Sequence, residues 1–421
     1  MLERYAIFGA GQSAQAARRL ARHHDLEVVL IDEAGQGDRA VFEAHDLADF
    51  DAFIFSPGFA QEHPWRVLAE ASGRPCMSEL AFAARYWQGK VIAVTGTNGK
   101  TTLTGLIDAA LKQAGHRSVC AGNIGFPFAD AVLTAANHPE AYVVLEVSSF
   151  QAELADGLSL DALLWTNFAE DHLDRYGSMI DYFNAKARLF ACLKPSGVCV
   201  LGAQVADWME AMHQEFNAYF VAQEDSALLF EIDRSCSFHR YPNSENFTLA
   251  AELWWLLGLS SAHLIEAANT FELEPHRLAR VADSEGVCYW DDSKATNFHA
   301  TLAALESVGP PVVWIGGGRA KGGDIEAFAR EVSDYVNAAV LYGEVAPRLA
   351  AALEGLLDSV QVFSCFADAV YAAAELAKSM TDANVLLSPG FSSFDQFGSY
   401  AERGKSFTDL VLSLKNTSNA S

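Results

Sequence analysis

Two patterns of hydrophobic positions alternate along the chain. Short apolar runs typical of buried strands include YAIFG at 5–9, EVVLID at 27–32 and DAFIFS at 51–56. Between the first two lies QSAQAARRLARHH at 12–24, whose apolar residues recur at helical spacing. Alternation of strands and helices is typical of a parallel sheet covered by helices. The pattern therefore predicts an α/β fold.

The succession of strand and helix patterns is interrupted at two places along the chain, which indicates separate domains. One change falls at Trp87–Gly89, just before an apolar run at Val91–Thr95, and the other at Phe271–Pro275. A chain of 421 residues is also too long for one hydrophobic core. We therefore predict three domains: 1–88, 89–274 and 275–421.

The stretch VIAVTGTNGKTT at 91–102 predicts a phosphate-binding loop between a strand and a helix. Glycines let backbone N–H groups turn toward a phosphate, and the helix N-terminus adds partial positive charge. The lysine would reach the terminal phosphates, and the threonine after it would hold magnesium. The loop is a short variant, since Val94 replaces the usual first glycine. The alternative is an ordinary turn with a surface lysine. The candidate residues are Gly96, Thr97, Asn98, Gly99, Lys100, Thr101 and Thr102.

A second glycine-containing turn, GAGQSA at 9–14, lies between the first strand and helix, and Asp32 ends the next strand. This arrangement is typical of dinucleotide-binding proteins. A closely packed strand-to-helix turn needs small residues with or without a ligand, however. Both interpretations stay open on this segment alone.

Three further residues suggest a metal site. Glu146 ends an apolar run, His172 follows an expected strand at 160–168, and Lys186 lies in the apolar stripe of an expected helix at 178–193. Burial favours an uncharged amine, which can react with carbon dioxide to give a carbamate, an oxygen ligand. With Thr101, these groups could hold one or two magnesium ions. Taken singly, each could instead be a surface glutamate, a core histidine or a snorkelling lysine.

Charge and cysteine content narrow the classes of partner. The chain has 54 acidic and 29 basic residues, a formal net charge of -25, which disfavours nucleic-acid backbones as partners. Its seven cysteines form no CxxC pair, so a reducing cytoplasm is expected rather than a disulfide framework. We expect no signal peptide, no membrane helix and no membrane partner, and a monomer by default.

Nine segments, in this order, resemble the Mur ligases along nearly the whole chain. They are TGTNGKTT (95–102), GNIG (122–125), EVSSFQ (146–151), NFAEDHLDRYG (167–177), NAKARLF (184–190), PHR (275–277), DDSKATN (291–297), GGRAKGGD (317–324) and LLSPGFSSFDQF (386–397). Within the family, the segments at 291–297 and 386–397 point to members that add glutamate. An N-terminal Rossmann-like domain for a UDP-substrate, a central P-loop ATPase-like domain and a C-terminal Rossmann-like domain for glutamate are what the resemblance implies.

The resemblance also implies a reaction. ATP would phosphorylate the carboxylate of UDP-N-acetylmuramoyl-L-alanine, and the amine of D-glutamate would displace phosphate from the acyl phosphate, in cytoplasmic peptidoglycan precursor synthesis. Lys100, Glu146, His172 and a carbamylated Lys186 would be catalytic. ATP contacts would add Asn246, Arg277 and Asp292. Substrate contacts would come from Ser13, Asp32, Asn123, His172, Lys294, Thr296, Lys321, Ser393 and Tyr400.

Some positions depart from the family pattern. Where relatives often carry an arginine after the strand-end acid, this chain has Asp32-Glu33-Ala34, and Leu249 replaces an asparagine of the adenine region, so that contact there must be apolar or come from elsewhere. Two alternatives stay open. One is a sister ligase with another amino acid, such as L-glutamate, and the other is a catalytically silent nucleotide-binding regulator.

Overall fold

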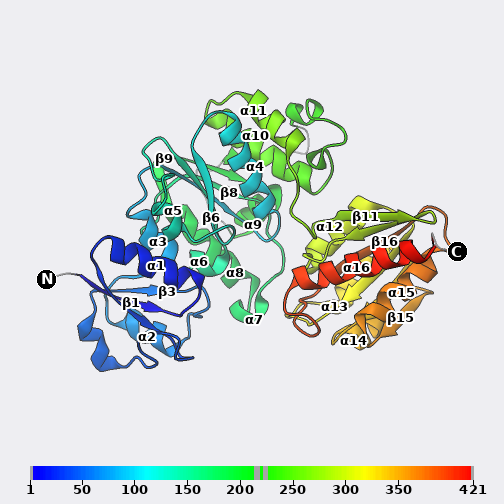
Figure 1. Ribbon diagram of the computed structural model, residues 1–421, viewed down its shortest axis with the longest axis horizontal. Helices are drawn as coiled ribbons and strands as arrows, with labels where there is room; N and C mark the ends of the chain where they lie inside the picture. Colours follow the sequence, from blue (N-terminus) through cyan, green and yellow to red (C-terminus); the bar gives the residue numbers. More distant parts are fainter. Residues whose placement is uncertain (1–2, 213–218, 221–225, 419–421) are drawn as a thin grey trace. The chain divides into compact units, whose positions relative to one another are not determined.

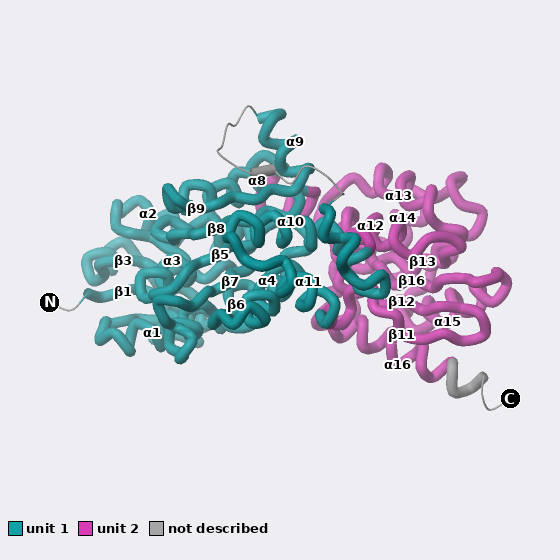
Figure 2. The backbone as a smooth tube through the Cα atoms, turned by 90° about the horizontal axis from the view of Figure 1, so that it is seen from above, with its two compact units in different colours: residues 1–168, 178–239, 243–271 teal, residues 169–177, 240–242, 272–421 magenta. Residues whose placement is uncertain are grey.

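The computed structural model describes residues 3–212, 219–220 and 226–418 of the chain (Figure 1). The described residues form three sheets of four, six and six strands, almost all parallel and flanked by helices. The predicted α/β fold is confirmed. Contacts between residues divide the chain into two compact units (Figure 2). Unit 1 holds 1–168, 178–239 and 243–271, and unit 2 holds 169–177, 240–242 and 272–421. The three-domain division stays a prediction.

The first sheet belongs to unit 1 and is parallel throughout, in the order β2-β1-β3-β4. Its strands are β1 (Arg4–Phe8), β2 (Glu27–Ile31), β3 (Ala52–Phe55) and β4 (Cys76–Ser78), and its helices are α1 (Gln12–His23), α2 (Pro64–Ala71) and α3 (Glu79–Ala84). Its core is mainly aromatic: the rings of Phe8 and Phe55 stack with centroids 4.3 Å apart. Each apolar run quoted above from this region forms a strand.

The second sheet, also in unit 1, is parallel in the order β10-β9-β8-β5-β7-β6. Its strands are β5 (Lys90–Thr95), β6 (Ser118–Gly122), β7 (Tyr142–Glu146), β8 (Leu160–Trp165), β9 (Leu193–Leu201) and β10 (Tyr219–Phe220). The helices are α4 (Lys100–Gln113), α5 (Phe128–Val132), α6 (Ser149–Ala152), α8 (Met179–Ala187), α9 (Ala203–Ala211), α10 (Asn243–Leu256) and α11 (Ser261–Thr270). The phosphate loop thus connects β5 at its carboxyl end to α4, as predicted.

Two predicted boundaries in this region are wrong. The strand expected at 160–168 ends at Trp165, because Thr166 and Asn167 turn aside and bind the phosphate loop. The helix expected at 178–193 ends at Ala187 and is followed by a 3-10 helix, Arg188–Cys192. Leu193 begins β9 instead, because it pairs with Leu160 of β8. Long-range strand pairing therefore overrides the helical pattern at this end.

The third sheet, in unit 2, has the order β11-β12-β16-β13-β14-β15, and only the β11–β12 pair is antiparallel. Its strands are β11 (Ala279–Ser284), β12 (Val287–Asp291), β13 (Val312–Gly317), β14 (Ala338–Tyr342), β15 (Val360–Phe363) and β16 (Ala383–Gly390). The helices of unit 2 are α7 (Leu173–Tyr176), α12 (Phe298–Val308), α13 (Ile325–Ser333), α14 (Ala346–Leu353), α15 (Phe366–Ala377) and α16 (Tyr400–Ser418).

Helices cover both faces of this third sheet. Val313 and Ile315 of β13 pack in a core with α15 and α16, whereas Val312 and Trp314 pack in a second core with α12, α13 and α14. Alternate residues of one strand therefore face opposite layers, as in a doubly wound α/β domain. Residues 275–277 form a turn in which His276 has φ of 66°.

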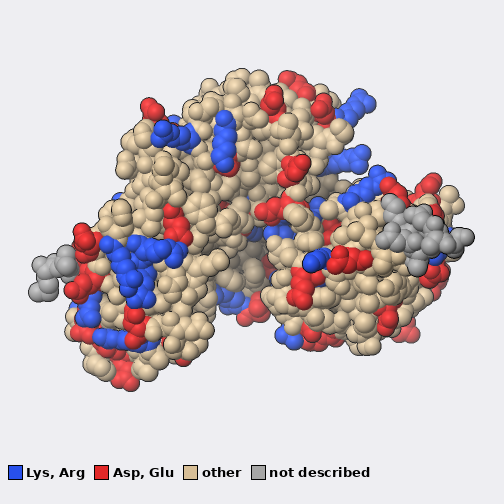
Figure 3. Space-filling view, viewed as in Figure 1, with Lys and Arg blue, Asp and Glu red and all other residues tan. Residues whose placement is uncertain are grey.

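Charged side chains mix on the visible surface. On the face shown in Figure 3, Lys and Arg side chains occur in small groups among Asp and Glu. Any positive potential on that face is therefore local. Among the described residues, none of the helices combines the length and the apolar character that crossing a bilayer requires.

Candidate active site

The phosphate loop is shaped by two glycines that no other residue could replace without movement. Gly96 has φ of 144°, and a Cβ built on it would lie 1.9 Å from the hydroxyl oxygen of Thr166. Gly99, which precedes α4, has φ of 80°, and its Cβ would lie 2.5 Å from Oδ1 of Asn246. Left-handed backbone and close approach both require glycine here. The loop therefore has the tight turn that the motif predicts.

Residues after β8 hold the loop from the side. The backbone N–H groups of Thr97 and Asn98 donate to the carbonyl and side-chain oxygens of Asn167, at 3.1 and 2.8 Å. The hydroxyl of Thr166 donates to the carbonyl of Asn98 at 2.5 Å. The conformation of the loop is therefore fixed by a neighbouring strand as well as by its own sequence.

Two lysines converge on one carbonyl oxygen of this loop. Lys100 Nζ donates to the carbonyls of Gly96 and Thr97 at 3.0 and 2.8 Å. Lys186 Nζ donates to the same Gly96 carbonyl at 2.8 Å and lies 4.9 Å from the centroid of the Tyr182 ring. Lys186 is only 1% exposed, as its place in an apolar stripe predicts. A lysine at the N-terminus of a helix fits an anionic ligand on electrostatic grounds, as the motif predicts for Lys100.

Glu146 ends β7 beside the loop and is 2% exposed. Thr101 donates its hydroxyl to Oε2 of this carboxylate at 2.8 Å, and Asn123 donates its side-chain amide to Oε1 at 2.7 Å. The carboxylate and hydroxyl oxygens are the ligands that Mg²⁺ prefers, so Glu146 and Thr101 fit a magnesium site. His172 belongs to unit 2. Residues 3–212, 219–220 and 226–418 contain no group of three or more His, Cys, Asp or Glu side chains that could hold a metal ion.

The predicted adenine region lies on α10. Asn246 is 4% exposed beside Gly99, so it reaches the phosphate loop. Leu249 is 1% exposed and packs in the apolar core of unit 1. It therefore offers no surface to a base, so of the two expectations, an apolar contact here or a contact from elsewhere, the second remains.

The glycine turn of the first sheet has a packing reason of its own. Gly9 has φ of 99°, and its Cβ would lie 2.8 Å from the hydroxyl oxygen of Ser56. The carboxylate of Asp32 accepts the backbone N–H groups of Ala34 and Gln36 at 3.1 and 3.2 Å, so it holds its own loop. Ser13 is partly exposed in α1. The contact of Ser13 and Asp32 with a nucleotide stays a prediction.

In unit 2, Arg277 and Asp292 lie at the start of the third sheet. The Nε and Nη2 atoms of Arg277 are buried and make no hydrogen bond within the described residues, and Nε lies 3.6 Å from Oε2 of Glu274. Asp292 accepts hydrogen bonds from Leu278 N at 3.0 Å and the Ser388 hydroxyl at 2.8 Å, and burial raises its pKa to about 7. A partly buried guanidinium whose Nη2 makes no hydrogen bond within the described residues fits an anionic ligand such as a phosphate.

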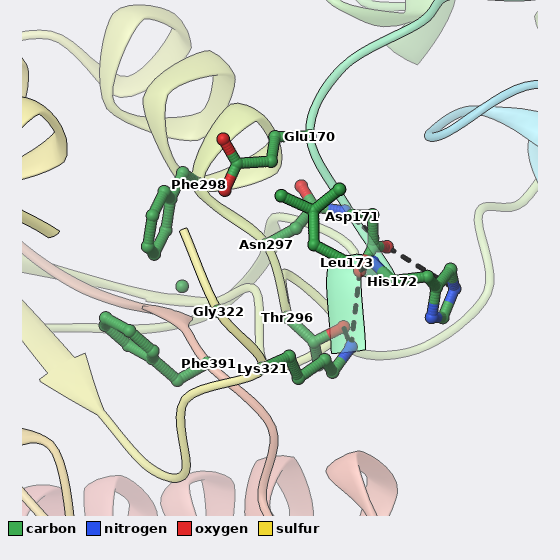
Figure 4. A pocket seen from close by; sticks show the side chains of 11 residues that line it. Glu170, Asp171, His172, Leu173, Thr296, Asn297, Phe298, Lys321, Gly322 and Phe391 are labelled. Carbon is green, nitrogen blue, oxygen red and sulfur yellow. Dashed lines mark hydrogen bonds and ion pairs between the residues drawn. The ribbon is translucent and has the colours of Figure 1, made fainter. Parts of the chain in front are cut away.

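A pocket in unit 2 brings together four distant segments: 170–173, 296–298, 321–322 and 390–391 (Figure 4). Lys321 Nζ lies 3.7 Å from Oδ1 of Asp171 and 3.4 Å from the hydroxyl oxygen of Thr296. The side-chain amide of Asn297 donates to Asp171 at 3.2 Å. Predicted residues Lys321 and Thr296 therefore meet, together with Asp171 and Asn297, to which sequence reasoning gave no role.

The charge of Asp171 is compensated within the pocket. Burial alone would raise its pKa, but attraction to Lys321 and His172 and hydrogen bonds from Asn297 and the His172 N–H hold the pKa below its usual value. Asp171 is therefore ionised and fixes the ammonium of Lys321 in place. His172, predicted as a metal and substrate residue, contacts Asp171 with its Nε2 at 3.7 Å.

The remaining predicted glutamate residues form a second group in unit 2. Lys294 Nζ lies 3.2 Å from the Tyr400 hydroxyl and 4.8 Å from the centroid of its ring. Ser393 is 3% exposed. Lys294, Tyr400 and Ser393 are outside the lining of the pocket around Lys321. The structure thus divides the predicted glutamate residues into two sets.

One organising residue of this second group escaped sequence reasoning. Arg403 of α16 is 0% exposed and donates to the Ser293 hydroxyl and carbonyl at 2.9 and 2.7 Å, to the Phe391 carbonyl at 3.1 Å and to the Tyr342 hydroxyl at 3.2 Å. It joins the loops that carry Lys294 and Ser393. A signal was available, since Arg403 precedes the buried Phe407 and Val411 by four and eight positions on one helix face.

Comparison with known proteins identifies the family of the chain. Residues 94–252 match the family model of the Mur ligase middle domain, and residues 276–390 match that of the Mur ligase, glutamate ligase domain. The UDP-N-acetylmuramoylalanine–D-glutamate ligase of Gloeobacter violaceus is 34% identical, over 97% of this chain and 99% of its own. That of Desulfotalea psychrophila is also 34% identical, over 98% and 96%.

Solved structures share the fold at low identity. UDP-N-acetylmuramate-alanine ligase MurC from Thermotoga maritima has a TM-score of 0.59 and 18% identity, over 99% of this chain and 100% of that one. The MurF ligase from Thermotoga maritima, solved in complex with ADP, has a TM-score of 0.57 and 16% identity, over 87% and 90%. Because both domain models and near full-length relatives agree, the chain belongs to the Mur ligase family.

Proposed function

We propose that the chain is an ATP-dependent ligase that joins D-glutamate to UDP-N-acetylmuramoyl-L-alanine in peptidoglycan precursor synthesis. The observation that carries the proposal is the convergence of Lys100 and Lys186 on the Gly96 carbonyl at the start of α4. Full-length relatives at 34% identity that bear this activity in their names support the choice of substrates.

The chemistry requires positive charge beside two anions. An oxygen of the substrate carboxylate attacks the γ-phosphorus of ATP, and ADP leaves. The amine of D-glutamate then attacks the acyl carbon, inorganic phosphate leaves with the bonding electrons, and the amine loses a proton to solvent. Carboxylate and triphosphate repel each other in the first step, so Lys100 lowers its barrier by stabilising the charge on the transferred phosphoryl group. Backbone N–H groups at the start of α4 would cradle the phosphates, since those of Thr97 and Asn98 already donate to Asn167.

Glu146 and Thr101 would hold magnesium, with His172 and a carbamylated Lys186 as further ligands. Magnesium supplies charge neutralisation between the phosphates when it is bound. The amide of Asn123 keeps the carboxylate of Glu146 turned toward Thr101, since it occupies the other oxygen. Arg277, Asn246 and Asp292 would contribute the remaining ATP contacts.

Glutamate would bind in unit 2. Lys321 and Thr296 would take one of its carboxylates and Lys294, Ser393 and Tyr400 the other, since each set offers one ammonium group and at least one hydroxyl. Ser13, Asp32, Asn123 and His172 would contact the UDP-substrate. We further propose three domains, 1–88, 89–274 and 275–421, acting in a cytoplasmic monomer with small-molecule substrates only, and with no nucleic acid or membrane partner.

A phosphate-release assay tests this function. The purified protein is given ATP, magnesium, UDP-N-acetylmuramoyl-L-alanine and each glutamate enantiomer in turn, and the amide product is identified by mass spectrometry. Release that requires the UDP-substrate and D-glutamate supports the proposal. Turnover with L-glutamate alone would establish a sister ligase, and nucleotide binding without turnover would establish a regulator; either result contradicts the proposal.

A further inference from the structure

Glu170 is a carboxylate in the unit 2 pocket that the reaction described above does not use. Its side chain extends from the turn at 170–173 toward Phe298 (Figure 4). It is partly buried, and none of the described residues offers it a hydrogen bond or an ion pair. A partly buried carboxylate beside other carboxylates is stabilised by a cation. The position of Glu170 therefore indicates a positively charged ligand group.

The charges around Glu170 lead to the same conclusion. The carboxylates of Asp324 and Asp171 lie close to Glu170. Asp324 accepts the N–H of Ala327 at the start of α13, and Asp171 is paired with Lys321. The cation that lines the pocket is therefore held by a different carboxylate, and negative potential remains at Glu170. An ammonium group would restore both the hydrogen bonds and the charge balance.

The residues around the Glu170 carboxylate pack closely against it. Gly323 has φ of 94°, and a Cβ built on it would lie 2.6 Å from Oε1 of Glu170 and 2.6 Å from the Phe298 ring. The rings of Phe298 and Phe391 are in edge contact, with centroids 5.3 Å apart. Aromatic rings exclude water and attract cations to their faces. A small ammonium group is thus favoured here over a bulky cationic side chain.

An amino acid carries a cation and an anion at one carbon atom, and this pocket offers a partner for each. Lys321 with Thr296 can take a carboxylate, and Glu170 can take the ammonium group. We propose that Glu170 binds the α-ammonium group of the incoming glutamate and thereby positions its nitrogen before attack. The inference rests on the proposed function, since it concerns the amino-acid substrate of that reaction.

Glutarate makes the inference testable, because it has the two carboxylates of glutamate and lacks the ammonium group. Calorimetric titrations of wild type and Glu170→Gln with each ligand, in the presence of a non-hydrolysable ATP analogue and the UDP-substrate, measure the discrimination directly. A charge-assisted hydrogen bond corresponds to about 10- to 100-fold in affinity. We expect Glu170→Gln to weaken D-glutamate binding about 10-fold or more and to leave glutarate binding unchanged or tighter.

Control variants test whether the loss of any negative charge, or a folding defect, could produce the same change in affinity. Glu354→Gln removes one negative charge at the exposed end of α14 and should leave both affinities unchanged. Glu170→Asp keeps the charge and should retain part of the preference for glutamate, and thermal melting confirms folding of each variant. Equal weakening of glutamate and glutarate by Glu170→Gln, or no change in either, overturns the inference. Discrimination that depends on Glu170 in a wild type that forms no amide supports the inference and overturns the proposed function instead.

Discussion

The phosphate loop of unit 1 and the pocket of unit 2 both present lysine ammonium groups, but they hold them in different ways. Lys100 and Lys186 donate to backbone carbonyls of one short loop. Lys321 is held by the side chains of Asp171 and Thr296, which come from segments far apart in the chain. Backbone partners are present in any sequence that makes the turn, whereas side-chain partners must each be brought there by the fold. This difference explains why the phosphate loop can be identified from a sequence motif, whereas the pocket of unit 2 cannot.

Two buried carboxylates, one in each unit, also differ in the direction of their pKa shifts. Asp171 lies beside Lys321, and its pKa is lowered. Glu79 of α3 is 3% exposed and accepts the N–H of Ala129 at 2.5 Å, and burial raises its pKa to about 8. The presence or absence of a neighbouring cation thus decides whether a buried acid is charged.

The largest expected effect is the loss of Lys100. Lys100→Ala should lower the rate of phosphate release about 1000-fold, because the phosphate loop loses the ammonium group proposed to stabilise the transferred phosphoryl group. The initial rate in the phosphate-release assay at saturating substrates measures it. Lys112→Ala, which removes an ammonium from the exposed side of the same helix and its pair with Asp108, is the control and should stay near wild type. A Lys100→Ala rate within 10-fold of wild type would contradict the role of this lysine.

Lys186→Ala should reduce the same rate about 100-fold or more, since it removes the second group at the Gly96 carbonyl. If Lys186 is carbamylated, a short carboxylic acid such as acetate should restore part of the activity by replacing the lost oxygen ligand. Lys100→Ala serves as control and should show no such rescue. Full activity of Lys186→Ala would refute the carbamate, and a lack of rescue would leave Lys186 as a cation only.

A change in the pocket of unit 2 should act on substrate binding rather than on phosphate transfer. Lys321→Ala should raise the KM for D-glutamate about 10- to 50-fold, because one charge-assisted contact to a carboxylate is lost. The KM for ATP should not move, and Lys321→Arg should recover part of the affinity. Steady-state kinetics with each substrate varied in turn measure both constants. A parallel rise in the KM for ATP would show that the two sites are not separable.

The smallest effect concerns stability. The folded-state pKa of Glu79 is raised, so the folded protein binds more protons than the unfolded chain between about pH 4.5 and pH 8. The free energy of unfolding should therefore fall as pH rises through this window and level off above it. Glu79→Gln should remove this dependence and stabilise unit 1 by roughly 1–3 kcal/mol at pH 8. Urea unfolding at pH 5, 7 and 9 measures it, with the exposed Glu62→Gln as control. A larger stabilisation at pH 5 than at pH 9 would contradict the assignment.

The sequence by itself determined the α/β layers, the phosphate loop before α4 and the burial of Lys186. These follow from local patterns: apolar periodicity fixes which face of a strand or helix is buried, and glycine spacing fixes a tight turn. The resemblance of nine segments then identified the family, and the comparison with full-length relatives confirms it.

Only the tertiary structure decided which side chains share a site. It ended the helix at Ala187 because Leu193 pairs with β8, buried Leu249 in the core and placed Asp171 against Lys321. Among the described residues, it gave Glu170 no cation partner. The physical reason is that strand pairing and charge compensation join residues far apart in the chain. The local propensity of a segment for helix or strand does not indicate which distant residues will contact it in the folded protein.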